Sequence, residues 1–125
     1  MSIRAKEIAF SCYPVTDFVR ARGFYEGVLG LKSTMLYGEP GGMQWAEYDI
    51  GGGTLSIGSA PQMKPSPDGC SVALEVEDFD AAIAQLRQHQ VRFRMEPFES
   101  PVCRMAIIHD PDGNSLLIHQ RKTRA

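Results

Sequence analysis

The sequence lacks the features that would suit it to a nucleic acid or a membrane. Its 125 residues include 13 basic and 15 acidic side chains, so the formal net charge is −2. Nucleic-acid binders depend on a basic excess that neutralises phosphates, and the one basic cluster, residues 121–124, is typical of a solvated terminus. No run approaches the roughly 20 apolar residues of a membrane span, and the first seven residues lack the apolar core of a signal peptide. We expect neither a nucleic-acid nor a membrane partner.

Cysteine and histidine are also scarce. The three cysteines, Cys12, Cys70 and Cys103, are widely spaced and form no CxxC pair. This pattern excludes a disulfide framework and a cysteine zinc site, and it favours free thiols in the cytoplasm. With only three histidines, a metal site would have to use carboxylates as well. The length predicts a single domain, residues 1–125.

The chain repeats itself when it is aligned with itself at an offset of 61 residues. Val15-Thr16-Asp17-Phe18 then falls on Val76-Glu77-Asp78-Phe79, Asp49 falls on Asp110, and Thr54-Leu55-Ser56-Ile57 falls on Ser115-Leu116-Leu117-Ile118. The same register holds at both ends of the unit without a gap. We therefore interpret the chain as an internal duplication.

The first copy follows a simple order of elements. Residues 8–15 are apolar and β-prone, Asp17 is a helix N-cap, and Phe18, Ala21, Tyr25 and Val28 lie on one face of a helix that ends at Gly30. Three strands follow, over residues 31–37, 43–50 and 54–58.

The second copy follows the same order of elements. A strand over residues 71–76 leads to a helix capped by Asp78 or Asp80, then to strands over residues 91–95, 102–109 and 115–120. Residues 97–101 read as a turn, and Asp110-Pro111-Asp112-Gly113-Asn114 reads as a hairpin turn. The fold class is thus α+β, with two tandem βαβββ modules at about residues 6–61 and 70–121, joined by a linker at residues 62–69.

Two motifs resemble a known family. Phe24-Tyr25-Glu26-Gly27-Val28-Leu29-Gly30-Leu31 after Val15-Thr16-Asp17 resembles V-x-D…F-Y-x-x-V-L-G-L, and residues 110–114 resemble its D-P-D-G-N turn. Both are typical of the vicinal oxygen chelate superfamily, which includes glyoxalases, extradiol dioxygenases and bleomycin-resistance proteins. The resemblance implies two curved mixed sheets that face each other around a cleft. It also implies a homodimer, whose modules pair within a chain or between chains.

In metal-dependent members of this superfamily, the first and last strand of each module carry a His, Gln or Glu ligand. The motifs place these four positions here at Phe10, Ser56, Ser71 and Leu117. None of the four is a usual ligand for a divalent metal. A shift by one residue does not help, because it moves the side chains to the other face of the sheet. The sequence therefore predicts no metal, no cofactor, and a resemblance to the small metal-free members that bind a ligand.

By the two-residue alternation of strands, a predicted ligand-binding cleft takes further residues on the same faces. The predicted cleft residues are Phe10, Cys12, Ser56, Ser71, Glu75, Leu117 and His119. Glu75 and His119 are the only catalytic candidates, as an acid/base pair or as an anchor for the ligand. We interpret Cys12 as packing, because no base or positive charge is assigned to its thiol. The single Trp45 reads as core or as a cleft residue.

These features support a small-molecule binding protein without a functional metal site, of the kind that sequesters a drug or toxin. A second hypothesis is a metal-dependent glyoxalase-like lyase or dioxygenase with other ligands, drawn from Glu47, Glu75, His109 and His119. A third is a non-catalytic interaction domain whose cleft is filled by its own side chains.

Overall fold

The computed structural model describes residues 3–122 and shows two four-stranded mixed sheets, each with one helical segment against it. The first module contains β1 Ser11–Pro14, α1 Phe18–Arg22, η1 Gly23–Val28, β2 Ser33–Gly38, β3 Gln44–Ile50 and β4 Gly53–Ser59. The second contains β5 Val72–Glu75, α2 Phe79–Gln88, β6 Phe93–Glu99, β7 Cys103–His109 and β8 Ser115–Arg121. The α+β fold of two βαβββ modules is thereby confirmed. Among residues 3–122, no helix has the length and apolar character needed to cross a membrane.

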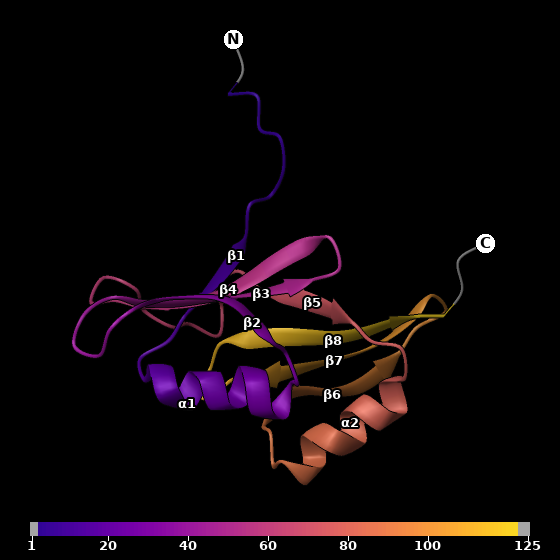
Figure 1. Ribbon diagram of the computed structural model, residues 1–125. Helices are drawn as coiled ribbons and strands as arrows, with labels where there is room; N and C mark the ends of the chain where they lie inside the picture. Colours follow the sequence, from indigo (N-terminus) through magenta and orange to yellow (C-terminus); the bar gives the residue numbers. More distant parts are fainter. Residues whose placement is uncertain (1–2, 123–125) are drawn as a thin grey trace.

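The two sheets have the same strand order. β1 lies parallel to β4 at one edge and β2 lies at the other, while β5 is parallel to β8 and β6 forms the far edge. In Figure 1 both helices lie on the lower side of the molecule, each beneath the sheet of its own module. Each sheet therefore has one face covered by a helix and one helix-free face.

Both helices begin where the sequence predicted. Asp17 and Asp78 are the N-caps, and their carboxylates accept hydrogen bonds from the backbone N–H of Arg20 at 3.0 Å and of Ala81 at 3.1 Å. Of the two possible caps of the second helix, Asp78 is therefore the correct one. Gly30 adopts φ 74°, the left-handed conformation that ends a helix at little cost in glycine.

Strand alternation divides each sheet into its two faces. Tyr13, Tyr48 and Ile57 point toward α1 and are almost completely buried, as are Ile108 and Leu116 beneath α2. These side chains belong to one continuous hydrophobic core that spans both modules. The core side chains lie on the faces of the sheets that the helices cover. The residues that alternate with them along each strand point to the helix-free faces.

The structure corrects three details of the sequence interpretation. The first strand begins at Ser11 rather than at residue 8, and β6 runs through Pro97, where a turn was expected. Proline is tolerated there because β6 is an edge strand with an irregular register. The repeat is also not free of gaps. The offset of 61 relates β1 to β5, and it relates Gly58 in β4 to His119 in β8. Trp45 lies opposite Gly58 and Met105 lies opposite His119, so β3 and β7 are related by an offset of 60. The turn between β7 and β8 is one residue longer, so Asp49 and Asp110 are not equivalent.

The longer turn joins the two modules. Asp110 is 2% exposed, and its carboxylate accepts hydrogen bonds from the Tyr25 hydroxyl at 2.8 Å and from the Asn114 side-chain amide at 2.9 Å. The same amide donates to the carbonyl of Pro14 at 2.7 Å, and the Asn114 side-chain oxygen accepts from the backbone of Ser66 in the linker. We call Asp110–Asn114 the junction turn, because this turn of module two forms hydrogen bonds with both module one and the linker.

A tyrosine from module one bonds to the second sheet in a similar way. The Tyr13 hydroxyl donates to the carbonyl of Ser115 at 2.7 Å and accepts from the backbone N–H of Val72 at 2.6 Å. Burial, the largest cause, raises the pKa of Tyr13 to about 12, so the hydroxyl keeps its proton at neutral pH. Thr16 and Arg20 reach the junction turn as well, where both bind the carboxylate of Asp112.

We predict that Tyr25→Phe destabilises the protein by about 2 kcal/mol, because it removes a hydrogen bond to a buried carboxylate. Tyr37→Phe is the matched control, since Tyr37 is 65% exposed and we expect its change to stay within about 0.5 kcal/mol. Urea unfolding of the two variants measures the difference. Equal effects would show that the Tyr25–Asp110 contact does not stabilise the fold.

We predict that the same substitution has opposite signs at two glycines. Gly113→Ala places a side chain at φ 87° in the junction turn and is expected to cost about 1 kcal/mol. Gly23→Ala replaces a helical glycine at φ −57° whose added carbon meets nothing within 4 Å, so we expect it to stabilise by about 0.5–1 kcal/mol. Thermal unfolding reports both signs, and a stabilising Gly113→Ala would contradict the assigned strain.

Candidate functional site

The helix-free face of the first sheet carries a row of four side chains. Cys12 pairs with Ser56 across β1 and β4, Ser56 with Glu47 across β3, and Glu47 with Met35 across β2. Because residues directly opposite in a sheet point to the same face, these four lie side by side. The row contains two of the predicted cleft residues, Cys12 and Ser56.

An aromatic cluster lies next to this row. Trp45 is opposite Gly58, and a carbon added to Gly58 would meet the indole ring at 2.9 Å, so the ring lies directly over the glycine. The Trp45 Nε1–H donates to Glu47 Oε2 at 2.9 Å, and the Phe10 ring meets Trp45 edge-on with centroids 5.1 Å apart. Trp45 is partly exposed and lies outside the buried core, which favours the second of its two sequence interpretations.

The helix-free face of the second sheet is mostly apolar. Leu117 lies between Ala73 and Ile107, and His119 lies between Glu75 and Met105. Leu117, Ile107 and Met105 are partly exposed although they belong to central strands of the sheet. An open apolar face of this kind suits an apolar ligand or a second protein surface. Sequence reasoning missed Ile107 and Met105, whose position follows only from the register between β7 and β8.

Glu75 and His119 form a close pair at the edge of this face. His119 Nδ1 lies 2.5 Å from Glu75 Oε1, and the backbone N–H of Arg121 donates to Glu75 Oε2 at 2.7 Å. The Arg121 N–H, as the larger cause, and His119 together hold the pKa of Glu75 below its ordinary value of 4.5. Since an ionised carboxylate only accepts hydrogen bonds, Nδ1 carries a hydrogen and donates a hydrogen bond to Glu75. In the neutral imidazole, Nε2 is then an acceptor that remains for a ligand.

Cys12 and Ser56 form a second close pair, in the first sheet. Ser56 is fully buried, and its hydroxyl donates to the carbonyl of Ser11 at 3.1 Å. Burial, the larger cause, raises the pKa of the Cys12 thiol, and a hydrogen bond with Ser56 opposes it only in part. A thiol with a raised pKa is mostly protonated at neutral pH and is a poor nucleophile. The geometry therefore agrees with a packing role for Cys12.

The four positions that carry metal ligands in relatives do not fit a metal here. Phe10 and Leu117 offer no donor atom, the Ser56 hydroxyl is engaged with a backbone carbonyl, and Ser71 is an exposed residue. Across residues 3–122, no three His, Cys, Asp or Glu side chains come together as a metal-binding group.

The alternative ligand set does not converge either. Glu47 binds Trp45, and His109 Nδ1 lies 3.1 Å from the carbonyl of Gly113, whereas Glu75 and His119 meet each other. The convergence that the second hypothesis would require is therefore not seen, since of these four residues only Glu75 and His119 meet.

The seven predicted cleft residues fall into two groups. Phe10, Cys12 and Ser56 belong to the first module, and the second group lies in the second module or just before it. The members of the second group are Ser71, Glu75, Leu117 and His119. Within the described part of the chain, no side-chain hydrogen bond links one group to the other. One chain thus presents two half-sites, one on each helix-free face.

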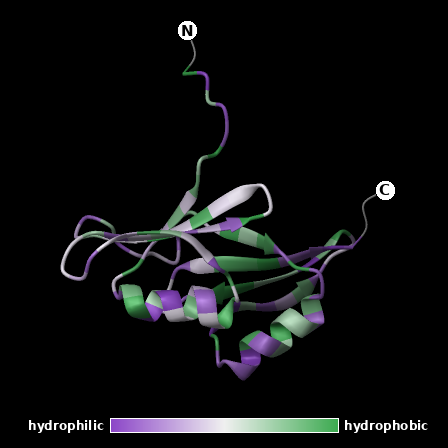
Figure 2. Ribbon diagram, viewed as in Figure 1, coloured by the Kyte–Doolittle hydropathy of each residue, from purple (hydrophilic) through white to green (hydrophobic). Residues whose placement is uncertain are grey.

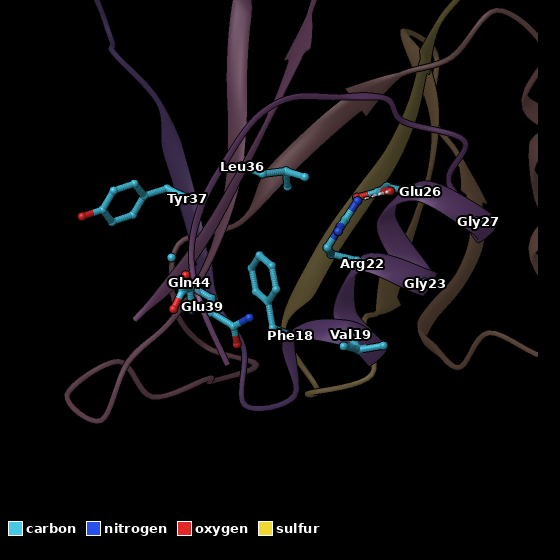
Figure 3. A pocket seen from close by; sticks show the side chains of 11 residues that line it. Phe18, Val19, Arg22, Gly23, Glu26, Gly27, Leu36, Tyr37, Glu39 and Gln44 are labelled. Atoms are coloured by element: carbon cyan, nitrogen blue, oxygen red, sulfur yellow. Dashed lines mark hydrogen bonds and ion pairs between the residues drawn. The ribbon is translucent and has the colours of Figure 1, made fainter. Parts of the chain in front are cut away.

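Two hollows lie away from the centres of these faces. A cavity of about 820 Å³ lies between α1, η1 and β2. Figure 3 shows that Phe18 and Leu36 face the ion pair of Arg22 and Glu26. The Tyr48 hydroxyl also donates to Glu26, and Arg22 is the main cause that lowers the pKa of Glu26. No predicted cleft residue lines this cavity. A second groove, of about 740 Å³, lies between Glu7 and Ile8, the turn after β3, and β5 with its Glu75.

Comparisons with known proteins agree with this geometry. The chain is 25% identical to the antibiotic binding protein TnmS3 from Streptomyces sp. CB03234, with a TM-score of 0.76 over 97% of this chain and 100% of that one. A glyoxalase/bleomycin resistance protein from the same organism is 27% identical, with a TM-score of 0.71 over 91% of this chain and 100% of that one.

Among curated proteins, the uncharacterized protein YaeR of Escherichia coli (strain K12) is 25% identical over 93% of this chain and 97% of its own. Residues 7–118 also match the family model described as Glyoxalase/Bleomycin resistance protein/Dioxygenase superfamily. This match spans both modules and includes both motifs on which the sequence resemblance rested. The chain is therefore a member of the Glyoxalase/Bleomycin resistance protein/Dioxygenase superfamily.

Proposed function

We propose that this protein binds an apolar small molecule and sequesters it, without a metal and without transforming it. The observation that carries the proposal is the chemistry of the helix-free faces. Where metal-dependent relatives carry ligands, this chain has Phe10 and Leu117, and their neighbours are Trp45, Ile107 and Met105. Aromatic, aliphatic and thioether side chains form the walls of sites for apolar ligands. The similarity to an antibiotic binding protein supports a role in binding a small molecule.

The pair of Glu75 and His119 gives this site its polar anchor. Because Glu75 fixes the proton on Nδ1, the Nε2 atom of His119 accepts a hydrogen bond from a hydroxyl or N–H group of the ligand. The ligand we propose is thus a largely apolar molecule, with rings that pack on Trp45 or Leu117 and at least one hydrogen-bond donor. This role needs no proton transfer and no metal.

We propose that the protein acts as a cytoplasmic homodimer. The three free cysteines suit a reducing compartment. The two half-sites lie on separate modules, and a second copy would bring another module opposite each of them. A two-fold dimer is also the commonest assembly of soluble proteins. With a net charge of −2, the chain offers no basic excess for a nucleic acid.

We predict that the chelator-treated protein takes up no stoichiometric Zn²⁺, Mn²⁺, Ni²⁺ or Fe²⁺ in calorimetric titrations, because the four family positions offer no adequate donor set. The same protein should bind apolar probes. The single Trp45 provides the readout, since its fluorescence should change saturably with an anilinonaphthalene sulfonate dye and with members of a panel of polyaromatic antibiotics.

Leu117→Asp should weaken this binding at least tenfold, because it places a charge on the apolar face. Val102→Asp is the matched control, at a 71% exposed residue just before β7, and should bind normally. Tight uptake of one metal per chain would contradict the proposal, and so would equal probe affinity in the two variants.

We predict that the pKa of the Glu75 carboxyl, measured by carbon-detected NMR titration, lies below 4.5 and rises toward that value in His119→Ala. Because the folded-state pKa is lowered, the contact stabilises the protein above the ordinary pKa of the carboxyl. That stabilisation is lost as the pH falls through the folded value. Glu96→Gln is a control that leaves the pair intact. An unchanged Glu75 pKa in His119→Ala would show that the imidazole does not hold the carboxylate.

A further inference from the structure

The segment before β1 projects from the body of the protein. Figure 1 shows residues 3–10, which we call the N-terminal arm, running away from the first sheet. At the base of the arm, the Phe10 ring packs edge-on against Trp45 of β3. Ile3 is 96% exposed, Ile8 84% and Phe10 45%. Figure 2 shows that apolar and polar residues succeed one another along the arm. An exposed segment with this many apolar side chains is typical of a surface that binds a partner.

We propose that the N-terminal arm pairs with the N-terminal arm of a second copy of this chain, as two antiparallel strands around a two-fold axis. The proposal rests on the homodimer proposed above and names the contact that forms it. It also accounts for the difference between the expected strand, which began at residue 8, and the observed β1, which begins at Ser11. The first residues of that strand lack their neighbour in a single chain.

The backbone of the arm is free to pair. β1 and β5 are each the terminal strand of their sheet, so each has one unpaired edge. The arm extends the unpaired edge of β1, and its backbone N–H and C=O groups have no partner in the described part of the chain. Exposed edges of this kind pair readily with another strand.

The sequence of the arm is complementary to itself. In an antiparallel pair centred between residues 6 and 7, Lys6 of one copy lies opposite Glu7 of the other, and Ile3 lies opposite Phe10. In the same register Ala5 lies opposite Ile8. Each of these pairs occurs twice because of the two-fold symmetry. Opposite charges and apolar side chains are the cross-strand pairs that stabilise a sheet.

The groove beside the arm gives the second arm a place to lie. This is the groove of about 740 Å³ whose walls include Glu7 and Ile8 of the arm, Leu55, and Val72 and Glu75 of β5. Glu7 and Glu75 line the groove, Glu75 being paired with His119, whereas the incoming arm carries the two cations Arg4 and Lys6 against the single carboxylate of its own Glu7. Charge complementarity therefore favours the arm of a second copy as the occupant.

The pairing also changes the conformation of one arm residue. Arg4 has φ 54° in the single chain, a left-handed conformation that is unfavourable for a non-glycine residue. As part of a strand, Arg4 would move to the extended region and this cost would disappear. A two-stranded contact alone is only marginally stable in water, so the apolar wall of the groove is a necessary part of the interface.

Charge reversal tests the pairing in the 125-residue chain, with sedimentation velocity over a range of concentrations. Lys6→Glu and Glu7→Lys each set like charges opposite each other twice per dimer. Each should raise the dissociation constant of the dimer about tenfold. The double variant Lys6→Glu/Glu7→Lys restores opposite charges and should return to within about threefold of the original value. Lys32→Glu and Glu39→Lys are the matched controls outside the arm and should leave the dissociation constant unchanged.

Three results would overturn the proposal: a chain that is monomeric at every concentration, single reversals without effect, or a double variant in which the two losses add. A dimer whose dissociation constant is the same in all the arm variants would contradict the arm contact but not the proposed homodimer. An arm-dependent dimer that binds none of the apolar probes would instead contradict the proposed ligand binding alone.

Discussion

The buried carboxylate of Asp110 is the interaction on which the relation between the two modules depends. It is removed from water almost completely and is stabilised by hydrogen bonds from Tyr25, from Asn114 and from the backbone of its own turn. A buried charge without such partners would destabilise the fold by several kcal/mol. Because Tyr25 comes from module one and the turn from module two, the carboxylate has its full set of partners only when the modules lie together. Asn114 adds the chain before α1 and the linker to the same network.

This arrangement explains why the candidate site is divided. With the junction turn and Tyr13 holding the modules together, each helix covers one face of its sheet, and both helix-free faces remain open. Three of the seven predicted cleft residues thus belong to the module of Trp45, and the other four to the module of Met105. The polar groups on these faces, Glu47 and the pair of Glu75 and His119, are already hydrogen-bonded within the chain. An apolar surface with fixed polar groups suits the binding of a ligand better than the chemistry of a metal centre.

Local patterns were enough to predict most of the fold. Asp17, Asp78 and Gly30 set the ends of the helical segments through backbone contacts within a few residues, and strand alternation gave the correct faces for Cys12 and Ser56. What could not be predicted depends on contacts between distant residues. The role of Asp110 needs Tyr25, 85 positions away, and the place of Met105 depends on the length of the turn before β8. β6 passes through Pro97 because no strand lies on its outer side, which only the strand order reveals.

The extra residue in the turn before β8 means that the two copies of the duplicated unit have become specialised. The equivalent turn in module one, between Ile50 and Gly53, is built from glycines and has no carboxylate or amide that could reach the other half. A chain made from two first modules would therefore lack the hydrogen bonds by which Asp110 and Asn114 join the two halves here. The two modules share the same strand order, but only module two contributes the junction turn and its hydrogen bonds. A substitution in the glycine turn should accordingly disturb the contact between the modules less than a substitution within Asp110–Asn114.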